Sequence, residues 1–561
     1  MSVLTQLMGL HEPFDILGYI FRDSTNSATY RCNIKEIAGL ARQHNKSKKE
    51  LKKMLMLAFL CIIFPWLSFR WWRNRSSVII NWPVVGMLPG LFRNSSRVHE
   101  FVTYLLQQCG GTFVFKGPWL GSLDFLVTSN PANVHHILRK KAFNYHKGLE
   151  FKEIFAESFG NGIFCADGDR WKTQRRTIHS FIKNSKFEEA AERNIQRKVL
   201  HGIFVILEHF SEQRKEVDMQ DVLKRFMFDY SCLLLLGFDP NSLSIEFPQV
   251  PYKQAYYDME EVILQRHLKP QRFWKLQNWL QFGEERKMKK GSEIFDRLLY
   301  QCISRKKDLL NRSKIQMDRE DFDLLTFMLV EDNDQEEREM SAFKKSDKYA
   351  RDMAFNLLSA GSEAVSSSLT WFLWLVATHP LVEKSILEEM KTNLNAKGDE
   401  KGRYFSFGEL SKLNYLQAAI CESLRLYPPV PFEHTVSIDS DTLPSGHRIG
   451  KNTRVIYCPY SMGRMEEIWG ADCLEFKPER WISNNGEIIH ISPYKFIAFN
   501  AGPRTCIGKD LAMVEMKAVG AAVIWNYSLQ VVEDHPILPA NSIVLHMKHG
   551  LMVRALKRCL S

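Results

Sequence analysis

The spacing of hydrophobic and polar positions changes along the chain and predicts three regions. Short runs at Thr112–Lys116 and Asp124–Thr128 are typical of strands. Long helical periodicity then dominates from about Phe187 to Leu394. In the last third, turn residues at Leu443–Gly450 before an apolar run at Thr453–Tyr457 indicate a β-hairpin. This order predicts a mostly α fold with a smaller, segregated β portion.

One of the helical patterns is unusually long. It runs from Tyr349 to Thr378 without proline, long enough to cross a whole domain, and the charged stretch Glu331–Lys348 before it is typical of a surface loop. Beyond residue 90, no Gly/Ser-rich linker or repeat divides the chain. We therefore expect residues 91–561 to form a single large domain.

The composition excludes several classes of protein. Of the 561 residues, 45% are hydrophobic and 25% are charged, which excludes wholesale disorder, collagen and coiled coil. The eleven cysteines are too sparse and irregular for the disulfide framework of a secreted protein. A reducing compartment is therefore expected.

An uncharged stretch, Met54–Phe69, interrupts the amino-terminal region. Its sixteen residues fall slightly short of the roughly 20 that cross a hydrocarbon core, but Trp71 and Trp72 suit the headgroup layer. We expect a single membrane anchor at residues 54–72. The alternative, a cleaved signal peptide, needs small residues at its end, where this stretch has Pro65 and bulky aromatic residues. Residues 73–90 hold two prolines and two glycines near their end and predict a stiff, non-helical linker.

The net charge of +11 gathers around that stretch. Residues 1–75 contain 12 Lys and Arg against 5 Asp and Glu, while the remaining 486 residues carry only +4. This placement favours an anionic membrane surface and argues against nucleic acid as a partner. Residues 1–53 show no repeat or strong period, and we treat them as an extension of uncertain origin. The hypothesis is that they reflect either an alternative start, with synthesis able to begin at Met54, or an error in the gene model.

The most specific motif is FNAGPRTCIG, which begins at Phe499 and precedes a helical run, Lys509–Trp525. Two glycines flank Cys506 in a loop that enters a helix, so the backbone can approach a bulky group and N–H groups can face a thiolate. Such an environment lowers the pKa of a thiol. An isolated cysteine is more often a buried structural residue, and only the surrounding pattern favours chemistry here.

That pattern resembles the cysteine loop of the cytochrome P450 superfamily of haem-thiolate monooxygenases, Phe-x-x-Gly-x-Arg-x-Cys-x-Gly. The resemblance implies the cytochrome P450 fold and haem b, with Cys506 as the axial metal ligand. It also implies that Phe499 shields the sulfur, that Gly502 and Gly508 make room for the porphyrin, and that Arg504 binds a propionate.

Further segments follow in the family's order. Glu422 and Arg425, followed by Arg480, resemble the buried Glu-Arg-Arg network that supports the cysteine loop. By the same resemblance Trp171 and Arg175 contact a haem propionate. His434 takes a place where the family often has a propionate-binding residue, the alternative being an ordinary loop histidine.

The long helix departs from the family pattern at its centre. Gly361 and Glu363 match the family's groove for dioxygen, but Ala364 replaces the usual threonine, whose hydroxyl holds a proton-delivering water chain. Ser366 lies about 200° around the helix from that position, and Ser362 is directed elsewhere, so neither replaces the hydroxyl simply. The resemblance names Gly361, Glu363 and Ala364 as the catalytic positions, with the source of the proton left open.

The resemblance is closest to the plant branch that oxidises fatty acids, alkanes and wax components. It implies insertion of one oxygen atom from O2 into a C–H bond of a long-chain lipid, with electrons from NADPH through NADPH-cytochrome P450 reductase. The expected location is the endoplasmic reticulum membrane, single-pass, with a cytosolic catalytic domain. Segments 143–165, 356–364, 430–434 and 546–551 are expected to line the pocket, with Phe155, Phe164, Val430 and Phe432 among them.

Two rival functions stay open because of Ala364. One is an oxygen-independent haem-thiolate isomerase or dehydratase of an oxidised lipid, which needs no protonation of oxygen. The other is a catalytically silent haem protein. Turnover of a hydroperoxide without NADPH would indicate the first, and no turnover at all the second.

Overall fold

The computed structural model describes residues 27–74, 78–119, 123–312, 322–330, 346–394 and 402–558. The chain divides into two compact units, Met1–Ser76 and Ser77–Ser561. The predicted linker, residues 73–90, falls across this division. The predicted surface loop lies mostly outside the described residues, as does the first half of the predicted extension.

In the first unit, one helix holds the whole uncharged stretch. Helix α2 (Ser27–Asn74) continues through Pro65, and large apolar side chains such as Leu57 and Ile62 are exposed on it. Among the described helices none is by itself long and apolar enough to span a membrane, although α16 (Asp347–Thr378) and α17 (Pro380–Leu394) meet the criterion as a pair bent by 104°. The anchor predicted at residues 54–72 is therefore helical and exposed but not confirmed as a span.

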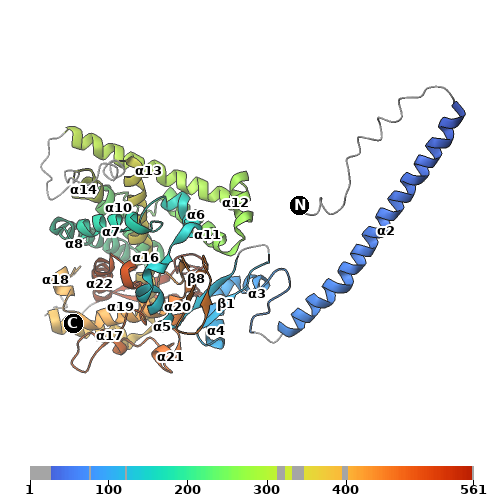
Figure 1. Cartoon of the computed structure of the whole chain (residues 1–561). Coiled ribbons are helices and arrows are strands. Elements are labelled where there is room, and N and C mark those ends of the chain that lie inside the picture. The colour runs from blue at the N-terminus through green and yellow to red at the C-terminus, as the bar shows by residue number, and fades with distance from the viewer. Residues whose placement is uncertain are drawn as a thin grey trace. The chain divides into compact units, whose positions relative to one another are not determined.

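The second unit is mostly helical, as the sequence predicts (Figure 1). Its helices besides α16 and α17 are α3 (Leu88–Arg93), α4 (Val98–Gln108), α5 (Pro131–His135), α6 (Gly148–Phe159), α7 (Gly168–Ile182), α8 (Ser185–Lys198), α9 (Phe204–Glu212), α10 (Met219–Leu236), α11 (Pro251–Leu268), α12 (Gln271–Leu280), α13 (Glu285–Arg312), α14 (Leu324–Val330), α18 (Phe407–Leu410), α19 (Asn414–Leu426), α20 (Pro459–Met462), α21 (Glu466–Trp469) and α22 (Lys509–Asn526). Helix α3 begins inside the predicted non-helical linker, because a proline at the second helical position loses no hydrogen bond.

The strands form three small sheets. The largest has the order β1-β2-β8-β5-β3, and the others are β4-β10-β9 and β6-β7. Their bounds are β1 (Thr112–Phe115), β2 (Phe125–Thr128), β3 (Tyr145–His146), β4 (Glu216–Asp218), β5 (Glu433–Ser437), β6 (Asp441–Thr442), β7 (Arg448–Ile449), β8 (Arg454–Tyr457), β9 (Tyr527–Val531) and β10 (Met552–Lys557). Strands β2 and β8 pair in parallel although most of the helices lie between them in sequence. The long helical region is thus one crossover between neighbouring strands, and Figure 1 shows β1 and β8 beside α4 and α20, at one side of the helices.

Helix α16 lies at the centre of the second unit. The Ser346 side chain accepts from the Tyr349 N–H and caps its start, and the helix ends at His379 before Pro380. It packs against α10, α13, α19 and α22, and most of its residues are buried. The helix therefore presents different faces to different partners, and the site depends on which residue points to which face.

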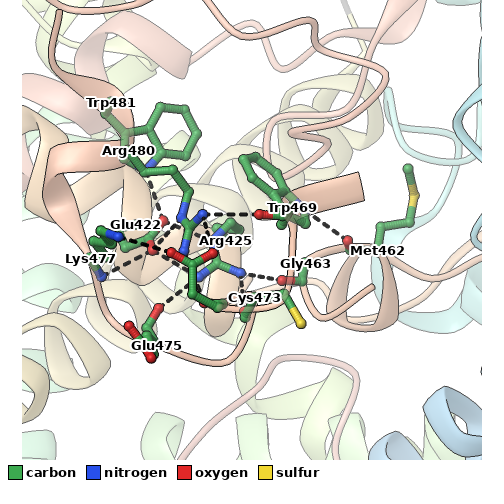
Figure 2. Close-up of polar contacts among 11 residues, drawn as sticks. Glu422, Arg425, Met462, Gly463, Trp469, Cys473, Glu475, Lys477, Arg480 and Trp481 are labelled. Atoms are coloured by element: carbon green, nitrogen blue, oxygen red, sulfur yellow. Dashed lines mark hydrogen bonds and ion pairs between the residues drawn. The ribbon is translucent and has the colours of Figure 1, made fainter. Parts of the chain in front are cut away.

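The predicted buried Glu-Arg-Arg network is confirmed (Figure 2). The Arg425 guanidinium donates to both Glu422 carboxylate oxygens at 2.7 and 2.8 Å, Arg480 Nε donates to Oε1 at 3.2 Å, and Trp481 Nε1 donates to Oε2 at 2.8 Å. Arg480 also binds Asp472, so that two carboxylates balance two guanidinium groups. The remaining Arg425 donors bind the backbone carbonyls of Gly463, Cys473 and Glu475. A charge cluster this well paired can stay buried and fix the loops around it.

Candidate functional site

A cavity of about 720 Å³ lies inside the second unit. Its wall includes residues of α6, α7, α10, α16 and α22, together with the loop that carries Cys506. The predicted site residues on this wall are Trp171, Arg175, Gly361, Ala364, His434, Phe499, Arg504, Cys506 and Gly508. Glu363 and Gly502 are not on it. The structure therefore brings nine of the eleven predicted positions to one cavity.

The cysteine loop is fixed by a backbone hydrogen bond and by the different surroundings of its two glycines. The Cys506 N–H donates to the Phe499 carbonyl at 2.8 Å, and Gly508 faces open space, which agrees with a role in leaving room for a large group. Gly502 has a different reason to be glycine. Its φ is +68°, and a Cβ there would lie 1.9 Å from the Leu138 carbonyl oxygen. Gly502 thus lets the loop pack against the backbone after α5, and it does not line the cavity.

The thiol of Cys506 faces into the cavity, where it is exposed, although the loop around it is enclosed by protein. Burial raises the pKa of this thiol, and the Gly508 backbone N–H and the Arg175 guanidinium oppose that rise without outweighing it. The predicted lowering of the pKa is therefore wrong as a net effect, since desolvation of a thiolate is the larger contribution. The predicted backbone N–H group is nevertheless in place, at Gly508, and Arg175 adds a positive charge that was not predicted for this role.

Cations and a tryptophan gather beside the cysteine loop. The Arg504 and Arg175 guanidinium carbons lie 4.8 and 5.7 Å from the Trp171 ring centroid. Arg504 binds Asp167 at 2.6 Å, and Arg175 donates to the Thr505 carbonyl at 2.8 Å. One cation is neutralised by a carboxylate and the other is not, so this wall retains positive charge for an anionic group.

His434 on the same wall is buried without a hydrogen bond. Neither ring nitrogen has a hydrogen-bond partner among the described residues. The Phe151 and His267 rings approach its ring edge-on, with centroids at 5.4 and 5.9 Å. Burial lowers the pKa of His434, and the charges of His267 and Lys147 lower it further. An unpaired buried imidazole is costly, and a ligand that accepts or donates a hydrogen bond at the cavity would satisfy it.

These residues fit a haem. They provide a soft sulfur ligand facing the cavity, a glycine that leaves room beside it, and arginine and histidine side chains for two propionates. The fit rests most directly on His434, because its two orphaned nitrogens are left unexplained by the protein alone.

Helix α16 turns two of its predicted residues to the cavity and one away. Gly361 and Ala364 lie on the wall, and a Cβ on Gly361 would come within 3.3 Å of Ser231 Oγ. Glu363 instead faces Lys224 on the other side of the helix, with its Oε2 3.6 Å from the Nζ. The sequence did not point to two hydroxyls on this wall, Ser231 beside Gly361 and Ser368 beside Ala364. Ser368, four residues after Ala364 on the same helix face, donates to the Ala364 carbonyl at 2.7 Å.

Aromatic side chains form the wall contributed by α6. The rings of Phe151, Phe155 and Phe159, spaced four apart, follow one another with centroids 4.3 and 5.4 Å apart, and Phe164 continues the row at 5.5 Å. All four line the cavity. The predicted lining by Phe155, Phe164, Val430 and Phe432 is confirmed.

The predicted lining by residues 546–551 is wrong. The cavity wall in this region is formed by Asn541, Ser542, Ile543 and Val544. The chain turns away at Leu545, where its carbonyl accepts hydrogen bonds from α16, and His546 lies beside Glu363. A turn of this kind moves the contact by a few residues, which sequence spacing does not reveal.

Comparison with known proteins gives consistent matches over most of the chain. A family model described as Cytochrome P450 matches residues 77–553. Alkane hydroxylase MAH1 of Arabidopsis thaliana is 40% identical over 505 residues, which cover 89% of this chain and 97% of that protein. Noroxomaritidine synthase 2 of Narcissus pseudonarcissus is 38% identical over 509 residues, 90% of this chain and 96% of its own. Cytochrome P450 86B1 of Arabidopsis thaliana is 36% identical over 520 residues, 91% of each chain.

Proposed function

Because the chain belongs to the cytochrome P450 family, we propose that it inserts one oxygen atom from O2 into a C–H bond of a long-chain aliphatic lipid, such as a fatty acid, an alkane or a wax component. Family membership makes it a haem-thiolate oxidoreductase that receives electrons through a reductase. The proposal adds the substrate class and the residues that serve the reaction.

The residues on the cavity wall have distinct tasks in this proposal. Cys506 is the thiolate ligand, and Arg175, Arg504 and His434 bind the propionates. The haem supplies the activation of O2, which no side chain can perform. Gly361 and Ala364 have small side chains, which leave space beside α16 for substrate and O2. Phe499 shields the cysteine loop from water.

The row of phenylalanines on α6 is the observation that carries the substrate class. Four stacked or edge-on aromatic rings form a continuous apolar surface that suits an extended alkyl chain. The name of one relative, an alkane hydroxylase, supports the same class. Relatives of similar identity named noroxomaritidine synthases show that similarity alone does not decide the substrate.

The test is product formation by the full chain with reductase and NADPH, offered an n-alkane, a fatty acid and a primary alcohol of equal length. We expect a hydroxylated product whose amount follows NADPH consumed, and a reduced, CO-bound absorption band typical of thiolate ligation. Cys506→Ser should abolish both, while Cys109→Ser, at an exposed position, should change neither. A folded wild-type protein without the CO band would contradict the haem assignment.

Ala364 favours a second candidate, an oxygen-independent isomerase or dehydratase of an oxidised lipid. Such a reaction does not need the hydroxyl that is missing at this position. The two candidates separate in one assay, since the second would convert a lipid hydroperoxide without NADPH. No turnover in either assay would leave a haem protein without catalysis.

We also propose that the protein is held at the endoplasmic reticulum membrane with its catalytic unit in the cytosol. The exposed apolar side chains of α2 support an anchor. A second group of exposed apolar side chains lies on α12 and just after it and suits contact with a membrane surface: Phe273, Leu276, Trp279, Leu280 and Phe282. A Leu57→Lys, Ile62→Lys double variant should move the full chain from the membrane to the soluble fraction. Its retention at the membrane after carbonate extraction would contradict the anchor.

A further inference from the structure

Four ionisable side chains meet on the face of α16 that points away from the cavity. They are Lys224 of α10, Glu260 of α11, Glu363 of α16 and His546 in the loop before β10. Their side chains are between 1% and 13% exposed. Four elements distant in sequence therefore bury two acids and two bases together, which is costly unless the charges match.

His546 stands between the two acids. Its Nε2 lies 3.3 Å from Glu363 Oε2 and 3.4 Å from Glu260 Oε2. Neither contact has hydrogen-bond geometry, and both His546 nitrogens and both Glu260 oxygens lack a hydrogen-bond partner among the described residues. One N–H cannot satisfy two acceptors at once, so the imidazole is placed to serve either carboxylate.

The ionisable groups of the cluster shift one another's pKa values. Lys224 and His546 hold the pKa of Glu363 down at about 2, against the rise that burial alone would cause. Burial raises the pKa of Glu260, while Glu260 and Glu363 raise that of His546. Positive charge at Lys224 and His546 therefore favours the ionised form of Glu363. The arrangement of Glu260, Glu363 and His546 resembles a metal-binding set, but the Lys224 ammonium already supplies the second positive charge.

A second, small cavity reaches this cluster from the side of α10 and α11. It measures about 30 Å³ and is lined by Glu363 and Lys224 together with Tyr256, Tyr257 and Lys253. That volume is enough for about one or two water molecules, and its walls offer polar partners. Lys224 Nζ donates to the Tyr257 hydroxyl at 2.6 Å, and Lys253 is partly exposed. Protons from solvent thus have a polar route to the Glu363 carboxylate.

The loop that carries His546 also forms part of the large cavity. Asn541–Val544 line that cavity, and the next carbonyl, that of Leu545, accepts from Ser367 Oγ at 2.7 Å and from Trp371 Nε1 at 2.6 Å. His546 follows immediately. One short segment therefore contacts the substrate cavity on one side of α16 and the Glu363 carboxylate on the other.

We propose that His546 is a positioning residue that holds Glu363 ionised behind α16 and passes it the proton that releases it toward the cavity. The proposal rests on the monooxygenase function and answers the question raised by Ala364, since it gives the protein a proton source without a threonine hydroxyl. Transfer moves the proton from His546 Nε2 to Glu363 Oε2 and leaves both groups neutral. Because the pKa of Glu363 is lowered and that of His546 is raised, this neutral pair is the minor form and exists only transiently. Glu363 is then no longer held by Lys224, and its neutral carboxyl can turn past the small side chains of Gly361 and Ala364. After Glu363 gives up the proton, its carboxylate returns to Lys224, and a proton taken from bulk solvent and relayed by water in the small cavity restores the charge of His546.

The first measurement needs no substrate. In the full-length, haem-loaded protein, infrared spectra recorded from about pH 4 to 8 report protonated carboxyl groups. His546→Gln should add a carboxyl band in the range of about pH 4 to 6, because Glu363 loses one of its two cations and its pKa rises. The part of this band that belongs to Glu363 should disappear in the His546→Gln, Glu363→Gln double variant, while Glu260, which also loses the imidazole cation, keeps its own part. Glu260→Gln should lower the pKa of Glu363 further and add no carboxyl band, since the His546 imidazole then interacts with Glu363 alone.

The second measurement is product formed per NADPH consumed with an n-alkane. His546→Gln should lower this ratio about tenfold above neutral pH. A tenfold loss corresponds to a shift of about one unit in the pKa that governs the population of the protonated donor. His549→Gln, at an exposed position three residues further along, is the matched control and should change neither measurement. An unchanged carboxyl titration in His546→Gln, with the CO band intact, would overturn the proposal. A wild-type protein that forms no product would overturn the proposed function and leave the infrared result as it stands.

Discussion

Two buried charge networks in this protein differ in how completely their members are hydrogen-bonded. Around Glu422, both carboxylate oxygens accept hydrogen bonds, and the Arg425 and Arg480 donors reach further carbonyls (Figure 2). Around Glu363, the partners are at 3.3 to 3.6 Å, and His546 and Glu260 lack hydrogen bonds among the described residues. A fully paired network resists change and supports the fold. An incompletely paired one has alternative arrangements of similar energy, which is what a proton-transferring group requires.

The largest expected effect lies in the first network. Arg425→Met should lower the free energy of unfolding by about 3 to 5 kcal/mol, because it leaves Glu422 buried with fewer cations. Loss of the CO band at lower temperature than in the wild type would measure it. Glu388→Gln in the exposed Lys384–Glu388 pair is the control and should stay within about 0.5 kcal/mol. Similar losses of stability in both variants would contradict the expected difference between a buried ion-pair network and an exposed ion pair.

A third buried carboxyl, Glu515 of α22, extends the comparison because no cation of the described residues forms an ion pair with it. Burial raises its pKa to about 8. In the native protein it therefore stays protonated while the unfolded chain ionises above its ordinary pKa, so stability falls as pH rises from about 4.5 to 8 and then levels off. Glu515→Gln should remove a loss of about 2 to 4 kcal/mol at pH 9 and change little at pH 4. Thermal unfolding across this range measures it, and an unchanged pH profile would contradict the prediction.

Lys224→Met tests the second network by its opposite sign. Glu363 has its pKa lowered to about 2 in the native protein, so its ion pairs stabilise the fold above the ordinary pKa and this contribution is lost as pH falls through about 2. Removing Lys224 should cost about 1 to 2 kcal/mol near neutral pH and nothing in strong acid. Chemical unfolding at several pH values measures the difference. A constant cost at every pH would indicate lost packing instead of lost charge pairing.

The smallest expected effect is on the cavity face of α16. Ala364→Thr restores the hydroxyl typical of the family and should raise product per NADPH by about twofold to fivefold, within about 1 kcal/mol of barrier height. An equal gain in the His546→Gln background would show that the two proton sources are independent. No gain in either background would show that the missing hydroxyl has no cost in this protein.

Local patterns predicted much of the fold and of the cavity. The strands at β1, β2 and β8 and the helix α16 lie within a few residues of their predicted bounds, because period and proline placement are local signals. Apart from Gly502, the predicted residues of the Cys506 loop line one cavity, because the spacing of residues within a single loop is a local property of the sequence.

The second network was not predictable in the same way. Lys224, Glu260 and His546 belong to segments separated by tens to hundreds of residues, and no spacing relates them. The available signal was a lysine among the apolar residues of α10, which indicates a buried partner without naming it. The face of α16 on which Glu363 lies depends on helix packing, so its distance from the cavity also required the structure.

For the long-chain substrate proposed above, the carbonyl of Leu545 has a further consequence. Held by two donors of α16, it makes the adjoining wall at Ile543 and Val544 rigid. An alkyl chain that is too long cannot displace this part of the wall without breaking two hydrogen bonds. The wall therefore limits the chain length that the cavity can hold at this end. For this proposed substrate class, variation in the accepted chain length is then expected at the phenylalanines of α6, whose rings can change rotamer one at a time.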